Sequence, residues 1–408
     1  MNLFTPLTLP NGSVLINRIA KAAMEENLAT PDNAPSDALF RLYRAWADGG
    51  CGLIISGNVM VERRAMTGPG GVVLDSDQDL PAFKRWAQCA QGNGTQCWLQ
   101  LNHPGRQMPK DMGQTTYAPS AVALDLGKLS DRFDVPQPLT VSQIETIIHQ
   151  FVLSAQLAEK AGFNGVQIHA AHGYLISQFL SPLTNRRTDE WGGAIENRAR
   201  LLLRIVREVK AAVGSAFAVS VKLNSADFQR GGFSAEDAKA VVNMLNLEHI
   251  DLLELSGGSY ETPAMQGETR DGSTLAREAY FLEFAKALKQ EATMPIMVTG
   301  GIRRKIIAEQ VIDSGIEMTG IATALAIKPD LVNAWKNNDD AVPTLRSITW
   351  KTKPLAALAN MAMVKYQLNR QSQSKTSRPN VSPLWALLLQ QVSNWQRTRR
   401  YKAALRNH

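Results

Sequence analysis

Short apolar runs alternate with helical patterns along most of the chain. Such alternation predicts a parallel sheet, because a parallel strand needs a long crossover to reach its neighbour. Eight repeats favour closure into a (β/α)₈ TIM barrel over an open sheet. We predict strands at residues 19–23, 52–61, 96–101, 165–169, 218–223, 252–255, 296–299 and 318–321. We predict helices at residues 37–48, 80–91, 142–160, 196–213, 235–247, 280–291 and 305–314.

Two further pieces flank this repeat. Residues 3–14 alternate around Pro10-Asn11-Gly12, which predicts an N-terminal β-hairpin. At the other end, residues 354–368 and 383–395 have helical patterns, separated by a polar linker at 369–381. We therefore predict a barrel domain, residues 1–340, and a helical C-terminal extension, residues 341–408.

Some local signals predict where helices begin and which loops matter. Ser142-x-x-Glu145 has the form of a capping box, and Ser234 precedes a run with acidic residues in its first turn. Two loops, residues 102–140 and 256–278, are longer than connectors need to be. They follow the third and sixth strands, so we expect both to cap one face of the barrel.

The composition is that of an ordinary globular protein, with 44% apolar and 20% charged residues. No apolar run is long enough to span a bilayer, and no basic-then-apolar leader follows Met1. The three cysteines, Cys51, Cys89 and Cys97, form neither a disulfide framework nor a Cys-x-x-Cys metal pair. A reducing compartment, and so a cytoplasmic location, is the expectation.

The net charge of +7 is unevenly distributed. Residues 341–408 hold twelve Lys and Arg and no Asp or Glu, so residues 1–340 carry 7 − 12 = −5. The basic extension has two interpretations: helices packed on the outside of the barrel with solvated charges, or an attachment surface for an anionic membrane or a partner subunit. No motif supports nucleic-acid binding, and the sequence leaves a homo-oligomer open.

Three hydrogen-bond donors gather where the fourth strand ends. His169 closes this strand, and His172 and Tyr174 follow in the next loop. In a barrel, catalytic groups lie where strands end. The two histidines are also candidate metal ligands, but no Asp or Glu between residues 165 and 188 supplies the carboxylate that such sites commonly have. Alternatively, the three residues are ordinary polar loop residues that hydrogen-bond to the backbone. Three donors at one strand end favour a functional site.

Other strand ends supply a polar set that fits the same face. Gln100 needs an amide-like partner, because an unpaired buried polar group costs on the order of 1–3 kcal/mol. Lys222 needs a negative charge, either the carboxylate of an Asp or a bound anion. Gly300, Gly301 and residues 320–324 follow the last two strands, where backbone amides often hold phosphate.

Residues 1–340 resemble the old yellow enzyme family, the FMN-dependent NADH:flavin oxidoreductases, NADH oxidases and ene-reductases. The resemblance is carried mainly by His169-Ala-Ala-His172-Gly-Tyr174-Leu-x-x-Gln178-Phe-Leu-Ser-Pro182, Asn185-Arg-Arg187-Thr-Asp189-Glu190-Trp191-Gly-Gly193 and Glu196-Asn197-Arg198. Supporting pieces are Asn17-Arg18-Ile19, Ala22-Ala23-Met24, Gly57-Asn58, Gln100 with His103-Pro-Gly-Arg106, and Ala326-x-x-Pro329-Asp330.

The resemblance implies a role for each candidate residue. FMN would lie at the barrel mouth, and NADH or NADPH would reduce it. The cofactor contacts carried over are Ala22, Ala23 and Met24 along the ring, Gly57 leaving room for it, Gln100 on its pyrimidine edge, Lys222 beside N1 and O2, and Gly300, Gly301, Ala322 and Thr323 at its phosphate. His169 and His172 would hold a substrate carbonyl oxygen, and Tyr174 would donate the proton.

The expected reaction is reduction of the activated C=C bond of an enone or enal, with no metal. The alternatives are the same barrel working as a dehydrogenase or desaturase, a non-catalytic flavin-binding module, and a metal-dependent hydrolase that uses His169 and His172 as ligands.

The chain departs from the family pattern in three places. Glu25 stands where many relatives have Thr or Cys, near the flavin's O4 and N5, where a carboxylate would lower the flavin potential unless it pairs with a base. Ala322-Thr323 replaces a usual Gly-Arg, which leaves the phosphate to backbone amides, Thr323 and Arg303. No cysteine follows Cys97, so we expect no iron–sulfur domain and direct reduction of FMN.

Overall fold

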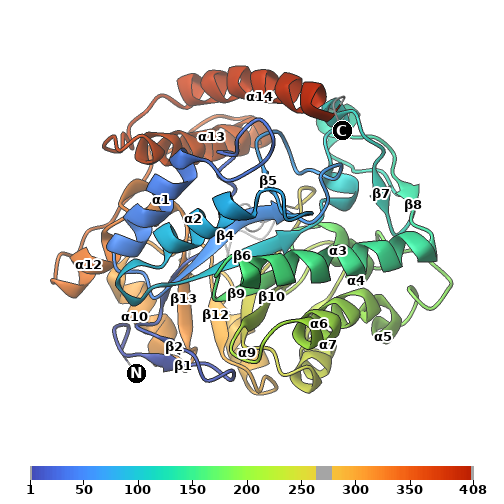
Figure 1. Ribbon diagram of the computed structural model, residues 1–408, viewed down its shortest axis with the longest axis horizontal. Coiled ribbons are helices and arrows are strands. Elements are labelled where there is room, and N and C mark those ends of the chain that lie inside the picture. The colour runs from blue at the N-terminus through green and yellow to red at the C-terminus, as the bar shows by residue number, and fades with distance from the viewer. Residues whose placement is uncertain (1, 263–277, 406–408) are drawn as a thin grey trace.

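The computed structural model describes residues 2–262 and 278–405. Among them, the main sheet has nine parallel strands, and the pairing of β13 with β3 and of β3 with β4 closes eight of these strands into a barrel. Figure 1 shows the barrel with its surrounding helices. The predicted (β/α)₈ fold is therefore confirmed. The barrel strands are β3 (Ile19–Lys21), β4 (Leu53–Met60), β6 (Gln96–Asn102), β9 (Gly165–Ala170), β10 (Ala218–Asn224), β11 (Leu252–Ser256), β12 (Ile296–Val298) and β13 (Met318–Ile321).

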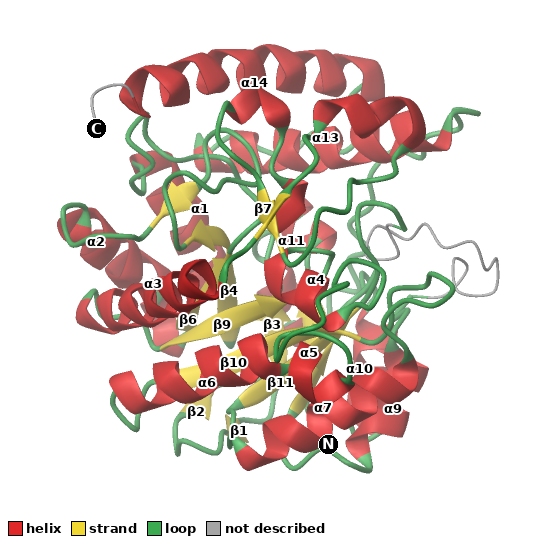
Figure 2. Ribbon diagram, turned by 90° about the vertical axis from the view of Figure 1, so that its right-hand side faces the viewer, coloured by secondary structure: helices red, strands yellow, loops and turns green. Residues whose placement is uncertain are grey.

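Helices surround the strands (Figure 2). Their apolar faces are buried against the barrel. In α1, for example, Leu39, Tyr43 and Trp46 repeat at helical spacing and are fully buried. The main helices are α1 (Asp37–Asp48), α2 (Leu80–Ala90), α3 (Val141–Lys160), α6 (Arg200–Ala212), α7 (Ala235–Leu247), α9 (Leu282–Lys289) and α10 (Lys305–Asp313). Shorter elements are helices α4 (Leu175–Leu180), α5 (Ile195–Arg198), α11 (Thr323–Ile327) and α12 (Leu331–Lys336), strands β5 (Val72–Val73), β7 (Tyr117–Ala118) and β8 (Gln137–Pro138), and 3₁₀ turns at Gly92–Gly94, Gly105–Gln107, Lys110–Met112 and Gly127–Arg132.

Two details of the predicted helices are wrong. The capping box of α3 is formed by Thr140 and Gln143, not by Ser142 and Glu145, because Thr140 is the extended residue whose hydroxyl accepts the Gln143 N–H. The helix predicted over residues 196–213 is two helices, α5 and α6, which meet at Ala199. The N-cap of α7 is Ser234, as predicted, and Asp237 forms a capping box with it that was not predicted.

The N-terminal hairpin closes one end of the barrel. Its strands, β1 (Leu7–Thr8) and β2 (Val14–Leu15), are antiparallel, and the turn contains Gly12 at φ 82°. Leu7 and Leu15 belong to one apolar cluster with the barrel-interior residues Ile55 and Trp98. This packing fills the lower half of the barrel, so a ligand site must lie at the other end.

The C-terminal extension lies on the side opposite the hairpin in both views (Figures 1 and 2). Its helices, α13 (Lys353–Ser372) and α14 (Pro383–Leu405), confirm the two predicted helical stretches, although both continue further than predicted and shorten the linker. Arg41 Nε donates to the carbonyl oxygen of Ser372 at 2.7 Å, and the Tyr401 hydroxyl donates to that of Arg63 at 2.8 Å. The extension is thus fastened to the barrel. Within the described residues, no helix combines the length and apolar content that a bilayer crossing requires.

Candidate active site at the barrel mouth

A cavity of about 870 Å³ opens at the carboxyl ends of the barrel strands. This volume lies within the roughly 300–1,000 Å³ that is usual for cofactor and ligand sites. All but one of the predicted site residues line it. They are Ala22, Ala23, Met24, Gln100, His169, His172, Tyr174, Lys222, Gly300, Gly301, Ala322 and Thr323.

Gly57 does not line the cavity, and close packing around its α-carbon explains why this residue is a glycine. A Cβ atom here would lie 2.1 Å from the carbonyl oxygen of Met24 and 2.1 Å from a carboxylate oxygen of Glu26. Its N–H also contacts the Tyr43 hydroxyl oxygen, at 3.1 Å. The structure therefore accounts for Gly57 through the packing of the segment behind Met24.

A buried chain of polar side chains crosses four barrel strands below the cavity. Gln100 Nε2 donates to Gln167 Oε1 at 2.7 Å, and Gln167 Nε2 donates to Glu254 Oε2 at 2.9 Å. The other oxygen of Glu254 accepts from Lys222 Nζ at 2.7 Å. The predicted amide partner of Gln100 is thus Gln167. Lys222 pairs with a carboxylate of the chain itself, that of Glu254 rather than the Asp that was predicted.

The register of the barrel explains this arrangement. Lys222 on β10 is level with His169 on β9 and with Glu254 on β11, and all three side chains are almost fully buried. Sequence analysis did not single out Gln167 or Glu254. A signal was available, since both are polar residues inside otherwise apolar strand segments, Val166–Ile168 and Leu253–Leu255.

His169 is held in one neutral tautomer. Its Nδ1 accepts the backbone N–H of Ala171 at 3.2 Å, so the proton of the neutral ring is on Nε2. Burial, and secondarily the charge of Lys222, hold the pKa of His169 well below its usual 6.5. His169 therefore acts as a neutral hydrogen-bond donor through Nε2–H.

His172 is placed beside His169 by a left-handed backbone conformation, φ 61°, which non-glycine residues rarely adopt. Its N–H donates to Asn224 Oδ1 at 3.1 Å, and its Nε2 lies 2.7 Å from the Ser256 hydroxyl oxygen. The two imidazole rings are 5.0 Å apart and nearly perpendicular. Burial, Lys222 and His169 lower the pKa of His172 well below 6.5, so both rings are neutral.

Tyr174 completes the group. Its ring centre lies 4.9 Å from that of His169, and its hydroxyl is 3.1 Å from the hydroxyl of Tyr260. Burial, with a further contribution from Glu25, raises the pKa of Tyr174, so the hydroxyl keeps its proton. Tyr260 was not predicted; it lies in the loop after the sixth strand, which was predicted to cap the site but falls largely outside the described residues.

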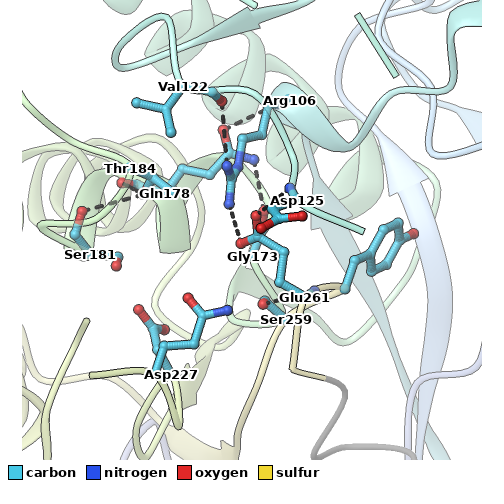
Figure 3. Close-up of polar contacts among 12 residues, drawn as sticks. Arg106, Val122, Asp125, Gly173, Gln178, Ser181, Thr184, Asp227, Ser259 and Glu261 are labelled. Atoms are coloured by element: carbon cyan, nitrogen blue, oxygen red, sulfur yellow. Dashed lines mark hydrogen bonds and ion pairs between the residues drawn. The ribbon is translucent and has the colours of Figure 1, made fainter. Parts of the chain in front are cut away.

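Gln178 fixes the loop that carries these groups (Figure 3). Its Nε2 donates to the carbonyl oxygens of Gly173, at 2.7 Å, and Pro104, at 3.1 Å, while its Oε1 accepts the Arg106 N–H at 3.2 Å. One side chain thus ties the loop after β9 to the loop after β6. Asn185, further along the same motif, also holds backbone in place: its Nδ2 donates to the carbonyl oxygens of Phe179 and Trp191.

The two long loops meet, as expected. Arg106, in the first loop, pairs with Glu261, in the second, at 2.5 Å (Figure 3). The other oxygen of Glu261 accepts the Asp125 N–H at 2.8 Å. Arg106 is only 4% exposed, so a buried ion pair joins the two loops next to the cavity-lining Tyr260.

The opposite side of the cavity has small residues and open backbone. Gly300 and Gly301 have φ of 117° and 75°, and a Cβ at Gly301 would lie 2.5 Å from the Tyr280 ring. Arg303 lines the cavity here, but it pairs with Glu278 at 3.1 Å. Thr323, at the start of α11, contributes a hydroxyl.

The donor set fits FMN. An amide and an ammonium group, Gln100 and Lys222, match the polar edge of a flavin ring. Glycine backbone and the Thr323 hydroxyl suit a phosphate, and Ala22 to Met24 supply an apolar strip between them. A metal fits less well: among the described residues, no three His, Cys, Asp or Glu side chains gather as ligands.

Comparison with known proteins agrees with this geometry. The family model of the NADH:flavin oxidoreductases and NADH oxidases matches residues 2–340. The chain belongs to this family. The resemblance to old yellow enzyme, the oxidoreductase class and FMN as cofactor are thereby confirmed.

Individual members of the family are similar over the same region. An NADH-dependent flavin oxidoreductase, iliE, of Neonectria is 37% identical over 349 residues, which cover 79% of this chain and 45% of that protein. Its namesake of Hypocrea jecorina is 36% identical over 346 residues, covering 79% and 86%. The solved old yellow enzyme homologue of Zymomonas mobilis superposes with a TM-score of 0.73 at 27% identity, covering 87% and 99%. The chain thus spans less than half of the Neonectria relative.

Proposed function

We propose that the protein takes hydride from NADH or NADPH through FMN and reduces the activated C=C bond of an α,β-unsaturated carbonyl compound. The observation that carries the proposal is the group formed by two neutral imidazoles and one protonated phenol on a single wall of the cavity. The relatives that are NADH-dependent by name support the choice of electron donor.

Each residue has a distinct task in this proposal. Bound FMN would supply the hydride chemistry. His169 Nε2–H and the His172 ring donate to the substrate's carbonyl oxygen, which makes the β-carbon electrophilic. Lys222 offsets negative charge that develops beside it. Tyr174 holds a proton through its raised pKa and delivers it to the α-carbon, while Tyr260 orients the Tyr174 hydroxyl.

Separating the two half-reactions tests the proposal. NADH and NADPH should each be tried for anaerobic bleaching of the bound FMN, followed by reoxidation with cyclohexenone. Tyr174→Phe should slow reoxidation roughly 10²–10⁴-fold, the usual contribution of a positioned acid, and leave bleaching unchanged. Tyr117→Phe, outside the cavity lining, is the matched control. Equal slowing of both steps would remove Tyr174 as proton donor, and no reoxidation by any enone or enal would overturn the substrate class.

We also propose that α14 attaches the protein to an anionic membrane surface. Six large apolar side chains on this helix are 39–59% exposed: Leu384, Trp385, Leu388, Leu389, Val392 and Trp395. Their spacing places them along one side of the helix, and exposed Arg399, Arg400 and Lys402 follow. An in-plane interfacial helix combines such a Trp/Leu face with basic residues. A second copy would instead bring like charges together, since residues 341–408 hold no Asp or Glu.

Sedimentation with vesicles tests this surface. The full chain should sediment with vesicles that contain about one-third anionic lipid, because basic segments bind anionic membrane surfaces. It should sediment much less with neutral vesicles. Trp385→Ser with Trp395→Ser should reduce binding, whereas Leu247→Ser, which changes a residue 76% exposed elsewhere, should not. Equal sedimentation with neutral and anionic vesicles, or none with either, would refute the attachment. A dimer in solution that the Trp variants break would assign the face to a second copy.

A further inference from the structure

The C-terminal extension forms part of the wall of the flavin cavity. Residues 343–348 and the α13 residues Asn360, Met361, Val364, Lys365 and Leu368 line the same cavity as Met24 and Tyr174. Helix α13 packs against α1 and α11, next to the first and last barrel strands. The cavity is therefore incomplete without residues that lie beyond the barrel domain.

One ion pair connects this wall to the flavin side. Lys365 Nζ on α13 lies 2.7 Å from Glu25 Oε2, and Thr67 Oγ1 donates to Glu25 Oε1 at 2.6 Å. Lys365 also donates to Asn27 Oδ1. Both partners are mostly buried, with side chains 19% and 25% exposed. Each carboxylate oxygen of Glu25 thus has a donor, and the ammonium group has two acceptors.

The charge of Glu25 reaches the catalytic group. Glu25 follows Met24 directly and lines the cavity. After burial, Glu25 is the next cause that raises the pKa of Tyr174, and it contributes in the same direction to the pKa of Tyr260. Lys365 has the opposite effect on Glu25 itself and holds the pKa of this carboxyl below its usual value against burial.

An unpaired carboxylate at this wall would oppose the addition of negative charge to the flavin. Charges interact strongly across short distances where water is excluded, and a half-buried pair is screened less than an exposed one. At residue 25, where relatives often have a neutral side chain, this chain has a carboxylate together with a cation from its own extension. The positive charge of Lys365 thus offsets the negative charge that the Glu25 departure introduces.

We propose that Lys365 is a positioning residue of the flavin site: it neutralises Glu25, holds it against Thr67 and α13, and thereby keeps the reduction potential of bound FMN from falling. This inference rests on the FMN site of the proposed function. The extension would then tune the flavin site, because Lys365, the residue that neutralises the charge of Glu25, lies on α13.

A charge cycle on the FMN-loaded protein tests the proposal, with dye-equilibrated reduction potential and FMN affinity as readouts. Lys365→Met should lower the potential, by about 30 mV for a tenfold change in the two-electron equilibrium constant. Glu25→Gln should raise it by a similar shift, and the double variant should return close to the wild-type value. Lys365→Arg keeps the positive charge and should therefore retain the wild-type reduction potential.

The control is Lys375→Met, which removes an exposed charge from the same extension; Lys375 Nζ contacts Gln373 rather than the cavity. If Lys365 only anchors α13, Lys365→Met will lower stability and leave the potential equal to that of the control, which overturns the proposal. Should Lys365→Met fail to fold, Glu25→Gln decides alone, since an unchanged potential contradicts the assigned role. No enone is used, so failure of the proposed substrate class leaves this measurement intact.

Discussion

Lys222 and Glu254 form a 2.7 Å ion pair between neighbouring barrel strands at the floor of the flavin cavity. Their side chains are 5% and 0% exposed. Only the lysine lines the cavity, whereas Glu254 is enclosed between Lys222 and Gln167. Lys222 thus presents its positive charge to a ligand in the cavity, and the buried carboxylate of Glu254 neutralises that charge from the other side.

Substitutions at this pair should therefore affect the free energy of unfolding and the affinity for FMN differently. Lys222→Met leaves a buried carboxylate uncompensated and should cost about 3–5 kcal/mol of unfolding free energy. Adding Glu254→Gln should recover most of this stability but not the affinity for FMN, since the cation is still absent. Urea unfolding and FMN fluorescence titration measure the two quantities. Lys286→Met, at an exposed pair with Glu283, should cost less than about 1 kcal/mol.

The two imidazoles should bind a phenolate as well as a carbonyl oxygen. A para-substituted phenol bound against the flavin gives a long-wavelength absorbance that reports its affinity. His172→Ala should abolish this absorbance, and His169→Asn should weaken phenol binding by roughly 10–150-fold, because a hydrogen bond to a charged group contributes about 1.5–3 kcal/mol. His149→Asn, at an exposed histidine on α3, should leave it unchanged. Undiminished phenol binding in both site variants would show that the anion binds elsewhere.

The same histidines predict a loss of stability in mild acid. Their pKa values are held well below 6.5 in the folded protein, first by burial. Below about pH 6.5 the unfolded chain takes up protons that the folded chain does not, so the unfolding free energy falls with pH. Between about pH 7.5 and 5.5, His169→Asn should therefore lose less stability than the wild type, by up to about 1.4 kcal/mol per pH unit below 6.5. The same dependence of the unfolding free energy on pH in His169→Asn and in the wild type would contradict the lowered pKa of His169.

Gly105 should be intolerant of a side chain. Its φ is 55°, and a Cβ atom would lie 2.2 Å from Gln178 Oε1. Gly105→Ala should thus displace Gln178, loosen the His169–Tyr174 loop and reduce both stability and turnover. Gly127→Ala is the matched control, with φ 58° and no atom within 4 Å of the added Cβ, and should cost only the backbone strain of about 1–2 kcal/mol. Thermal unfolding and enone turnover compare the two. Equal losses would mean that contact with Gln178 is unimportant.

Local patterns in the sequence determined the barrel. Eight strand patterns and seven helical patterns give the order of elements, and the position of His169 and Lys222 near strand ends follows from that order. The N-cap of α7 at Ser234 was predicted from the acidic residues in the first turn of that helix, whereas the capping box of α3 was placed two residues too late. These features depend on neighbours along the chain, which is why the sequence alone reveals them.

The electrostatics of the site were decided by the tertiary structure. Whether Lys222 faces a carboxylate depends on the register of β10 against β11, and Tyr260 meets Tyr174 only after two loops fold together. Glu25 and Lys365 are 340 positions apart, so no local pattern could pair them. The partners of buried charges and hydroxyls are determined when strands and helices pack together. In this protein, that packing depends on the closed barrel and on α13, which covers the barrel mouth.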